Sequence, residues 1–564
     1  MTARGTAGAD ASPNIVLTGF MGSGKSAVAR AVAERLGRPL VDMDDAIARR
    51  AGMSIPDIFS RQGEGAFRRL ERALCEELAA PAGRVIATGG GALVDPSNRD
   101  LLARGGHLIC LDGDPEELLR RVGDGLGRPM LRPDGPAGSA DDAEARFRAL
   151  WRERRPAYAD IPYHVDTTVR SQEEVVDAVI ALAAAEPISW RVSTPTGAYR
   201  VYLMAGGLER LGDELRARDA GARWYSGGNV VVVSDENVWP LHGERLMAGL
   251  RRAGLAPREV VLPAGERFKT LATVSDLYER FIDAGQAGGS AHAEGHSPSA
   301  GLDRGGAVLA LGGGVITDMA GFAAATYMRG VPLVPVPTSL LAMVDASVGG
   351  KVAVDHPRGK NLIGAFVEPL MVMLDPTVLD TLPEVERLAG LAEIIKAGVI
   401  ADPELFAAFE KGSAADLRWL VARALQVKID VVQEDPYEQG RRMVLNLGHT
   451  FAHALEVLED FGLHHGLAVS IGMAAAAHLG VIRGHCSTET RDRIIAVLRA
   501  QGLPTRYGAH LPEAIYRAMA ADKNRRVGRL RFIVPRAIGD VVIDPDVPEA
   551  DVLAALGAIA GSDT

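Results

Sequence analysis

The chain has 564 residues, with 62 Lys and Arg against 72 Asp and Glu, so its net charge at pH 7 is −10. Hydrophobic residues make up 47% and charged residues 24% of it, a globular balance that excludes disordered, collagen-like and disulfide-scaffold chains. At about 150 residues per domain, this length predicts three or four folded units. The acidic balance gives no reason to expect nucleic acid or an anionic membrane as a partner.

Cysteine content and the N-terminus indicate the compartment. Cys75, Cys110 and Cys486 are odd in number and far apart, so we expect no disulfide framework. Residues 1–13 are small and polar and are expected to form a disordered tail without a signal peptide. No stretch reaches the roughly 18 uninterrupted apolar residues of a spanning helix. The sequence therefore predicts a soluble, cytoplasmic protein.

The N-terminal third alternates short β-type runs with helical patterns. The run Asn14 to Thr18 precedes a helical pattern that Gly37 ends, and the alternation continues to a helix over 173–185. Such alternation predicts an α/β fold with a parallel sheet over residues 14–185. Residues 186–196, rich in proline, are expected to be a linker.

A second alternating region follows the expected linker. It predicts a second α/β domain over 197–378, in which residues 285–306 form a surface loop insertion because they lack apolar periodicity. From 379 to 560 the pattern is mostly helical, which predicts a third, helical domain.

A phosphate-binding motif lies between the first expected strand and helix. The segment 19–26, GFMGSGKS, fits G-x-x-x-x-G-K-[ST]. Gly22 and Gly24 let backbone amides surround phosphate oxygens, Lys25 can reach the β- and γ-phosphates, and Ser26 can bind Mg²⁺. The alternative, a glycine-rich turn with a solvated lysine, is much less common in this context. The motif predicts ATP with Mg²⁺ as the cofactor of this domain.

The residues that could bind the phosphate acceptor are weak signals individually and are informative only together. Asp42 and Asp44 follow an expected strand, where ligands bind in open α/β sheets, although such pairs are more often helix caps. The other candidates are basic residues and a glycine run: Arg68 near Glu71, Gly89 to Gly91, Arg128 before Pro129, and Arg154 before Tyr158.

Together these residues resemble shikimate kinase, a nucleoside-monophosphate-kinase-like P-loop family, over residues 14–185. The resemblance implies that Asp44 holds the shikimate hydroxyls and assists proton removal, while Asp42 lies on the Mg²⁺ side. It further implies that Arg68, Arg154 and the backbone of Gly90 bind the shikimate carboxylate, and that Arg128 reaches the transferred phosphate from a lid. A guanidinium fork suits a planar carboxylate.

Three features of the second α/β region indicate a dinucleotide. Asp235 closes an expected strand, where an acidic residue can bond a ribose hydroxyl. Glu266 and Lys269 could add polar contacts. A glycine run allows backbone to approach a pyrophosphate, with the candidates Gly313, Gly314, Val315 and Asp318. The run is not G-x-G-x-x-G, which disfavours a standard Rossmann dehydrogenase.

A metal site is indicated in the helical region. His449 and His453 are four residues apart in an expected helix, so both imidazoles share one face, although such spacing alone is more often structural. Glu393 and His465 could complete a Glu/His/His site with open positions, as in catalytic zinc centres.

Cationic and amide side chains are dense around these metal candidates. In an acidic protein, they suggest a phosphorylated substrate that carries hydroxyls and a carboxylate. The residues are Lys351, Lys360, Asn361, Lys396, Lys428, Arg442 and Asn446, with the carboxylate Asp345 nearby.

Residues 197–560 resemble 3-dehydroquinate synthase in the segments 326–330, 337–345, 359–364 and 446–450. The resemblance implies NAD⁺ and Zn²⁺ (or Co²⁺) as cofactors and a homodimer. The implied reaction converts 3-deoxy-D-arabino-heptulosonate 7-phosphate to 3-dehydroquinate by oxidation, phosphate loss, re-reduction, ring opening and aldol closure.

The same resemblance implies the role of each residue. Glu393, His449 and His465 bind the metal, His453 transfers protons, and Arg329 reaches the phosphate across the dimer interface. Contacts to NAD⁺ fall to the acidic, glycine and lysine candidates above together with Thr338, Ser339 and Lys360. Contacts to the substrate fall to Asp345, Lys351, Asn361, Lys396, Lys428, Arg442 and Asn446.

The sequence departs from the family pattern at three positions. Leu467 stands where the pattern has the glutamate of His-Gly-Glu. Thr317 replaces a glycine, and Asn524 replaces the second lysine of Asp-Lys-Lys. Because the first change removes a carboxylate two residues from His465, we expect it to alter zinc affinity or substrate detail.

The leading hypothesis is a bifunctional enzyme of aromatic biosynthesis. One alternative makes the C-terminal half another sugar-phosphate cyclase or a polyol dehydrogenase of the same superfamily. A dehydrogenase would release NADH and would not need so many anion-binding side chains. A second alternative is that one half has degenerated into a binding domain, which the intact site residues disfavour.

Overall fold

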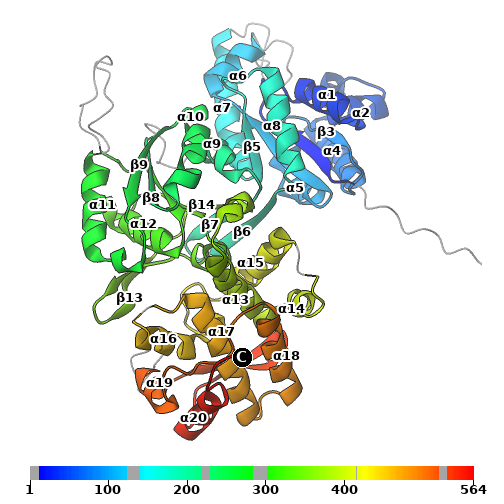
Figure 1. The fold of residues 1–564 in the computed structure, drawn as a ribbon. Coiled ribbons are helices and arrows are strands. Elements are labelled where there is room, and N and C mark those ends of the chain that lie inside the picture. The colour runs from blue at the N-terminus through cyan, green and yellow to red at the C-terminus, as the bar shows by residue number, and fades with distance from the viewer. Residues whose placement is uncertain are drawn as a thin grey trace, which may run out of the picture. The chain divides into compact units, whose positions relative to one another are not determined.

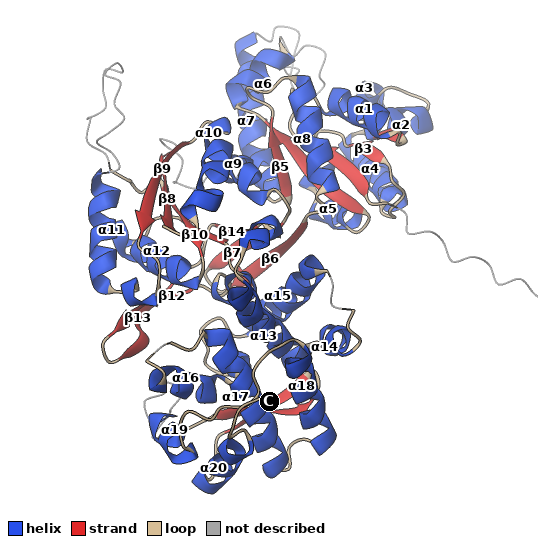
Figure 2. Ribbon diagram, viewed as in Figure 1, coloured by secondary structure: helices blue, strands red, loops and turns tan. Residues whose placement is uncertain are grey.

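The computed structural model describes residues 12–123, 140–217, 229–283, 301–413, 416–460, 462–519 and 530–563 (Figures 1 and 2). Its contacts group the chain into two compact units. The first unit contains the chain up to Pro187, together with the described residues of 209–217 and with Gly249–Gly254. The second contains Ile188–Leu208 and most of the remaining chain.

The first unit is built on a five-stranded parallel sheet of order β2-β3-β1-β4-β5. Its strands are β1 (Asn14–Thr18), β2 (Leu40–Asp42), β3 (Val85–Ala87), β4 (Gly106–Asp112) and β5 (Tyr163–Asp166). Its helices are α1 (Lys25–Leu36), α2 (Met43–Ala51), α3 (Ile55–Gln62), α4 (Glu64–Leu78), α5 (Pro96–Ala103), α6 (Pro115–Val122), α7 (Ala140–Ala159) and α8 (Gln172–Ala184). The central strand β1 is buried along its whole length, as its continuous apolar run predicts. The expected parallel α/β fold is confirmed.

The second unit contains a four-stranded parallel sheet of order β11-β10-β8-β9. A three-stranded sheet of order β14-β7-β6 and the hairpin β12-β13 accompany it. The strands are β6 (Ile188–Thr194), β7 (Gly197–Leu203), β8 (Asn229–Asp235), β9 (Ala256–Leu262), β10 (Ala307–Gly312), β11 (Leu333–Pro337), β12 (Lys351–His356), β13 (Gly359–Phe366) and β14 (Met371–Leu374). The helices in this part of the chain are α9 (Gly207–Ala217), α10 (Glu244–Arg252), α11 (Leu271–Asp283) and α12 (Gly314–Thr326), although most of α9 and the end of α10 group with the first unit.

The rest of the second unit is mainly helical. Its helices are α13 (Glu384–Ala401), α14 (Pro403–Glu410), α15 (Leu417–Glu434), α16 (His449–Leu458), α17 (His465–Ile482), α18 (Thr488–Ala500), α19 (Pro512–Ala518) and α20 (Glu549–Ala558). Helix α17 is long and apolar enough to cross a membrane by length and composition, but 72% of it is buried inside the protein. It packs against α13, α16, α18 and α20 and is therefore the core helix of this region.

Two segments differ from the sequence prediction. The linker expected over 186–196 is wrong for most of its length, because Ile188–Thr194 form β6, which pairs antiparallel with β7. Prolines 187 and 195 flank this strand rather than interrupt it, so proline content was a misleading signal. The helical region also contains an antiparallel pair, β15 (Phe532–Ala537) and β16 (Asp540–Asp544).

Two other expected segments fall largely outside the described residues. These are the tail expected over 1–13, of which residues 12 and 13 are described, and the insertion expected over 285–306, of which 301–306 are described.

Candidate active sites

Three helices of the second unit bring Glu393, His449 and His465 together. Glu393 lies in the middle of α13, and each histidine is the first residue of its helix, α16 and α17. The Nε2 atoms of His449 and His465 lie 3.8 and 3.7 Å from Glu393 Oε1. The ligand-type atoms of the three residues all lie within 4.8 Å of one another. The structure thus brings together the predicted metal ligands.

The donor atoms of this cluster fit a divalent cation. Glu393 Oε1 is buried and has no hydrogen-bond partner among the described residues, while its other oxygen pairs with Lys396. His449 Nδ1 lies 3.2 Å from the Leu447 carbonyl, and His465 Nδ1 lies 3.2 Å from Glu456 Oε1. These contacts leave both Nε2 atoms facing Glu393 Oε1, the usual arrangement of metal-binding histidines.

The protonation state of His449 also favours metal binding. Burial, with the charges of Lys396 and the neighbouring histidines, lowers the pKa of His449 well below its usual range. The imidazole is therefore neutral at pH 7, which is the form that binds zinc. His453 lies beside the cluster, its ring centre 5.5 Å from that of His449, and is not one of the three converging residues. This position agrees with a separate role for His453.

Cationic side chains surround the metal candidates. Lys396 lies one turn after Glu393 on α13, and the Lys428 ammonium on α15 lies 2.5 Å from Asp345 Oδ1. Burial opposes ionisation of Asp345, but the charges of Lys428 and Lys396 lower its pKa well below its usual range. Asp345 is therefore a carboxylate that holds Lys428 in place.

Arg442 is almost fully buried beside this cluster. It donates from Nη1 to the Pro436 carbonyl and from Nη2 to the Gly349 carbonyl, at 3.0 Å for the second bond. Its Nε is buried without a partner among the described residues. A buried guanidinium with one unused donor is suited to an anionic ligand.

Glu438 is a candidate residue that sequence reasoning missed. Its Oε2 lies 2.5 Å from Lys351 Nζ, and its Oε1 accepts a hydrogen bond of 3.0 Å from Asn446 Nδ2. Glu438 therefore connects two residues that were predicted to contact the substrate, Lys351 and Asn446. It lies in a loop with φ of 56°, and no periodicity or motif in the sequence marks it.

The predicted nucleotide residues gather at the carboxyl ends of β8, β9, β10 and β11. Asp235 ends β8 and accepts hydrogen bonds from the amides of Asn237 and Val238, so it also shapes the turn. Gly313 caps α12, which starts with Gly314 and Val315. Thr338 and Ser339 follow β11, and the Thr338 amide donates to the Gly312 carbonyl. All lie at the edge where open α/β sheets bind ligands.

A buried polar group lies next to this edge. Lys269 Nζ donates to Asp318 Oδ2 and Asn361 Oδ1, both at 2.6 Å. Lys360 Nζ lies 3.3 Å from Glu266 Oε1. Asn361 has a φ of 54°, and its amide donates to Asp355, so the backbone and side chain are both fixed. Predicted nucleotide and substrate residues therefore touch one another here.

The three sequence departures have different outcomes. Thr317 lies in the first turn of α12, where its hydroxyl donates to the Gly314 carbonyl at 3.1 Å, so the helix accommodates it. Leu467 is half-buried in the first turn of α17. Asn524 lies outside the described residues.

In the first unit, the phosphate-binding segment joins β1 to α1. Gly22 and Gly24 have φ values of 86° and 84°, which residues with a Cβ adopt with strain. A Cβ on Gly22 would also lie 2.6 Å from the Leu118 carbonyl of α6. Lys25 and Ser26 begin α1, and Lys25 Nζ donates to the Phe20 carbonyl at 3.0 Å. The helix N-terminus therefore lies where the motif predicts a phosphate site.

The acceptor candidates of the first unit also converge. The glycine run after β3 lies close to two of them: a Cβ on Gly89 would be 2.6 Å from Asp44 Oδ1, and one on Gly91 would be 2.7 Å from Arg68 Nη1. Arg154 donates to the Gly90 carbonyl at 2.9 Å. These contacts join α2, α4, α7 and the end of β3 around one site.

Two carboxylates near these candidates already have partners within the protein. Glu71 is buried and lies 2.5 Å from Arg68, so a substrate carboxylate must share that arginine with it. Asp42 Oδ1 accepts hydrogen bonds from the amides of Asp44 and Asp45, so Asp42 is the N-cap of α2. The Tyr158 hydroxyl also donates to the Gly90 carbonyl, next to Arg154.

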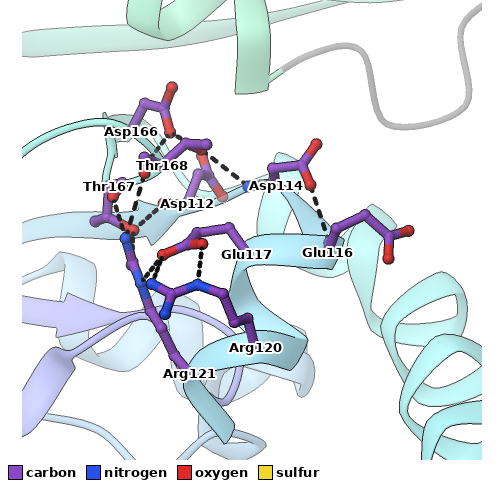
Figure 3. A network of polar contacts seen from close by, with 9 residues as sticks. All are labelled: Asp112, Asp114, Glu116, Glu117, Arg120, Arg121, Asp166, Thr167 and Thr168. Atoms are coloured by element: carbon purple, nitrogen blue, oxygen red, sulfur yellow. Dashed lines mark hydrogen bonds and ion pairs between the residues drawn. The ribbon is translucent and has the colours of Figure 1, made fainter. Parts of the chain in front are cut away.

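Helix α6 lies against the phosphate-binding segment at Gly22, and Figure 3 shows how the helix is tied to the residues that follow β5. Arg121 pairs with Glu117 on the same helix and donates to the hydroxyl and the carbonyl of Thr167, after β5, at 3.0 and 2.7 Å. Arg128 follows α6 in the chain and lies outside the described residues.

Arg329 of the second unit is exposed, next to Met328, and the two residues have positive φ values of 67° and 50°.

Comparison with known proteins shows which families the two parts of the chain match. The chain is 44% identical over 367 residues to the 3-dehydroquinate synthase of Desulforamulus reducens, covering 64% of this chain and 96% of that protein. The chain belongs to the 3-dehydroquinate synthase family. Residues 259–389 match the family described as 3-dehydroquinate synthase N-terminal, and 390–525 the C-terminal one. Residues 21–184 match the family described as shikimate kinase.

Further relatives agree with this assignment. The synthase of Synechocystis is 42% identical over 377 residues, which cover 65% of this chain and 98% of that protein. A solved structure of ValA, a 2-epi-5-epi-valiolone synthase of Streptomyces hygroscopicus with NAD⁺ and Zn²⁺ bound, is 30% identical with a TM-score of 0.55. It covers 66% of this chain and 99% of ValA.

These findings confirm the prediction of a bifunctional shikimate-pathway enzyme, with one kinase domain and one synthase part. Identity to 3-dehydroquinate synthases is higher than to the other sugar-phosphate cyclase, ValA. The family assignment therefore favours the leading hypothesis over its alternatives.

Proposed function

We propose that the second unit converts 3-deoxy-D-arabino-heptulosonate 7-phosphate to 3-dehydroquinate and phosphate at the Glu393/His449/His465 cluster. The observation that carries the proposal is the buried Oε1 of Glu393, which has no hydrogen-bond partner in the described part of the chain and faces two histidine Nε2 atoms. Cationic side chains lie beside it. A site that would combine a Lewis-acidic divalent cation with buried ammonium groups suits a polyhydroxylated anion.

The three converging residues would hold Zn²⁺, and the carboxyl edge of β8–β11 would hold NAD⁺. When bound, the metal supplies a Lewis acid for a substrate hydroxyl, and the nucleotide accepts and returns a hydride within each turnover. Lys428 and Arg442 would bind and neutralise the substrate's anionic groups, with Asp345 fixing Lys428. Lys351 would also bind an anionic group of the substrate, and Glu438 would hold Lys351 and Asn446 next to each other.

The proton-transfer roles also fall to residues of this chain. His453 lies beside the metal cluster without joining it, so its imidazole can exchange a proton with the substrate. Lys396 keeps one oxygen of Glu393 neutralised.

In the first unit, we propose ATP-dependent phosphorylation of shikimate. Lys25 would leave the Phe20 carbonyl to contact the β- and γ-phosphates, and Ser26 would bind Mg²⁺. Asp44 would accept the proton of the attacking hydroxyl, while Arg68 and Arg154 bind the carboxylate. Asp42 uses Oδ1 to cap α2, so its other oxygen would serve the Mg²⁺ side. Arg128 would reach the transferred phosphate.

We further propose that the protein is a cytoplasmic homodimer formed through the synthase part. Its exposed Arg329 would contact the substrate phosphate in a second subunit. Mixing two inactive variants, Arg329→Ala and His449→Ala, tests this arrangement, because a mixed dimer would regain one complete site. Absence of any regained synthase activity from a mixture shown to exchange subunits would contradict it.

The decisive experiment combines product NMR with phosphate release. Purified chain is supplied with 3-deoxy-D-arabino-heptulosonate 7-phosphate, NAD⁺ and Zn²⁺, and separately with ATP, Mg²⁺ and shikimate. We expect one phosphate per 3-dehydroquinate without net NADH, and one ADP per shikimate 3-phosphate. Net NADH would instead indicate a polyol dehydrogenase. No turnover by folded, zinc-loaded protein would indicate a cyclase for another sugar phosphate.

A further inference from the structure

The metal cluster has a carboxylate behind one of its histidines that the sequence motifs did not mark. Glu456 lies on α16 and is only 2% exposed. Its Oε1 lies 3.2 Å from Nδ1 of His465, the first residue of α17. The same oxygen lies 3.6 Å from the Lys360 ammonium of β13. One oxygen of a buried carboxylate thus contacts both a predicted metal ligand and a cation.

The two histidines are supported differently. His449 Nδ1 faces a neutral backbone carbonyl, that of Leu447, whereas His465 Nδ1 faces the charged Glu456. A carboxylate that accepts the Nδ1 proton fixes the tautomer and ring orientation and makes Nε2 a stronger ligand. Loss of Glu456 should therefore weaken the bond from His465 Nε2 to the metal and leave the bond from His449 unchanged.

The position of this carboxylate also bears on Leu467. The family pattern has a glutamate at 467, two residues after the ligand, and this chain has a half-buried leucine there. Glu456 contacts the ligand ring itself, from a different helix. The metal cluster therefore keeps a buried carboxylate without one at 467.

We propose that Glu456 is the positioning residue of His465 and sets the metal affinity of this chain, with Lys360 neutralising it at the same oxygen. This inference rests on the proposed metal site. Lys360 lies 3.3 Å from Glu266 as well, so it joins the β9 and β13 side of the unit to α16. Its two carboxylate partners hold its ammonium group beside Glu456.

The test is the zinc dissociation constant, measured by chelator competition without NAD⁺ or substrate. Glu456→Gln keeps the shape and a hydrogen-bond acceptor but removes the charge, and we expect affinity to fall about 10- to 100-fold. Glu456→Asp keeps the charge but shortens the side chain, and we expect a fall as well. Near-UV circular dichroism of each metal-free variant confirms that it is folded.

The matched control is Glu459→Gln. Glu459 is the C-cap residue of the same helix, and its Oε1 accepts a hydrogen bond of 2.5 Å from the Tyr507 hydroxyl rather than contacting His465. We expect its zinc affinity to equal that of the unchanged protein. Unchanged affinity in folded Glu456→Gln and Glu456→Asp would overturn the proposal.

A further variant separates failure of this proposal from failure of the proposed function. His465→Ala removes a ligand, so it should abolish tight zinc binding. If His465→Ala loses zinc but both Glu456 variants keep it, the metal site stands and the role of Glu456 is wrong. If His465→Ala keeps zinc, the metal site itself is wrong.

Discussion

Lys351 and Glu438 form an ion pair in which Nζ lies 2.5 Å from Oε2. Desolvation lowers the pKa of Lys351 from 10.5 to about 8, although 44% of its side chain is exposed, and Glu438 opposes this change by stabilising the cation. Lys351 therefore loses its charge in the range where the enzyme is easily assayed. This pair links the geometry of the synthase site to a measurable pH dependence.

The first prediction follows from the direction of this shift. Lys351 is protonated below about pH 8 and neutral above it, so binding of an anionic substrate should weaken as the pH rises through 8. We expect kcat/KM of the synthase to fall with an inflection near that pH. Glu438→Gln removes the stabilising charge, so the inflection should move to lower pH. An unmoved inflection in this variant would contradict the role of Glu438, and Lys351→Met is the control that should abolish it.

The second prediction separates the two activities by variant and by metal. His449→Ala removes a metal ligand and with it the Lewis acid, so it should lower synthase activity by more than the roughly 10²- to 10³-fold loss of a single electrostatic contact and leave the kinase unchanged. Lys25→Ala should do the reverse. Removal of zinc by a zinc-selective chelator in excess Mg²⁺ should mimic His449→Ala. Parallel assays of both activities, with inductively coupled plasma mass spectrometry of the bound metal, check the two variants and the zinc removal. Equal loss of both activities would count against separate sites.

The third prediction concerns the shikimate carboxylate. A Cβ on Gly91 would lie 2.7 Å from Arg68 Nη1 and 3.0 Å from its Nη2, so Gly91→Ala should displace this flexible guanidinium. We expect KM for shikimate to rise about tenfold, as for one lost charge-assisted hydrogen bond, with KM for ATP unchanged. Gly65→Ala is the matched control, because its Cβ meets nothing closer than 3.7 Å. Equal KM values for shikimate in the two variants would refute the assignment.

The fourth prediction concerns stability of the second unit. Lys269 and Asp318 have side-chain exposures of 5% and 18%, and removing one partner of a buried pair leaves an uncompensated charge. Lys269→Met should therefore lower the free energy of unfolding by about 3–5 kcal/mol. Urea denaturation measures this, with the exposed Lys411→Met as a control of about 0.5 kcal/mol or less. The double variant Lys269→Met/Asp318→Leu should recover much of the loss, and its failure to do so would point to the bond with Asn361.

Local patterns predicted the elements that depend on neighbours in the chain. The phosphate-binding segment, the parallel sheet of the first unit and the helix that starts at His449 could all be predicted, because each rests on short spacing or on a buried β-type run. The linker prediction failed at β6, because proline content says nothing about whether the segment between the prolines has a strand to pair with. That partner, β7, begins after two intervening residues and pairs with β6 as an antiparallel hairpin.

The sequence by itself determined which residue types were present for each chemistry: a lysine and glycines for phosphate, and histidines with a glutamate for a metal. Only the tertiary structure decided which carboxylate each cation and each histidine contacts. Glu438 meets Lys351, and Glu456 meets His465 and Lys360. These pairs come from different elements, and they form because buried charged groups need compensating partners wherever the packing of helices and strands supplies them.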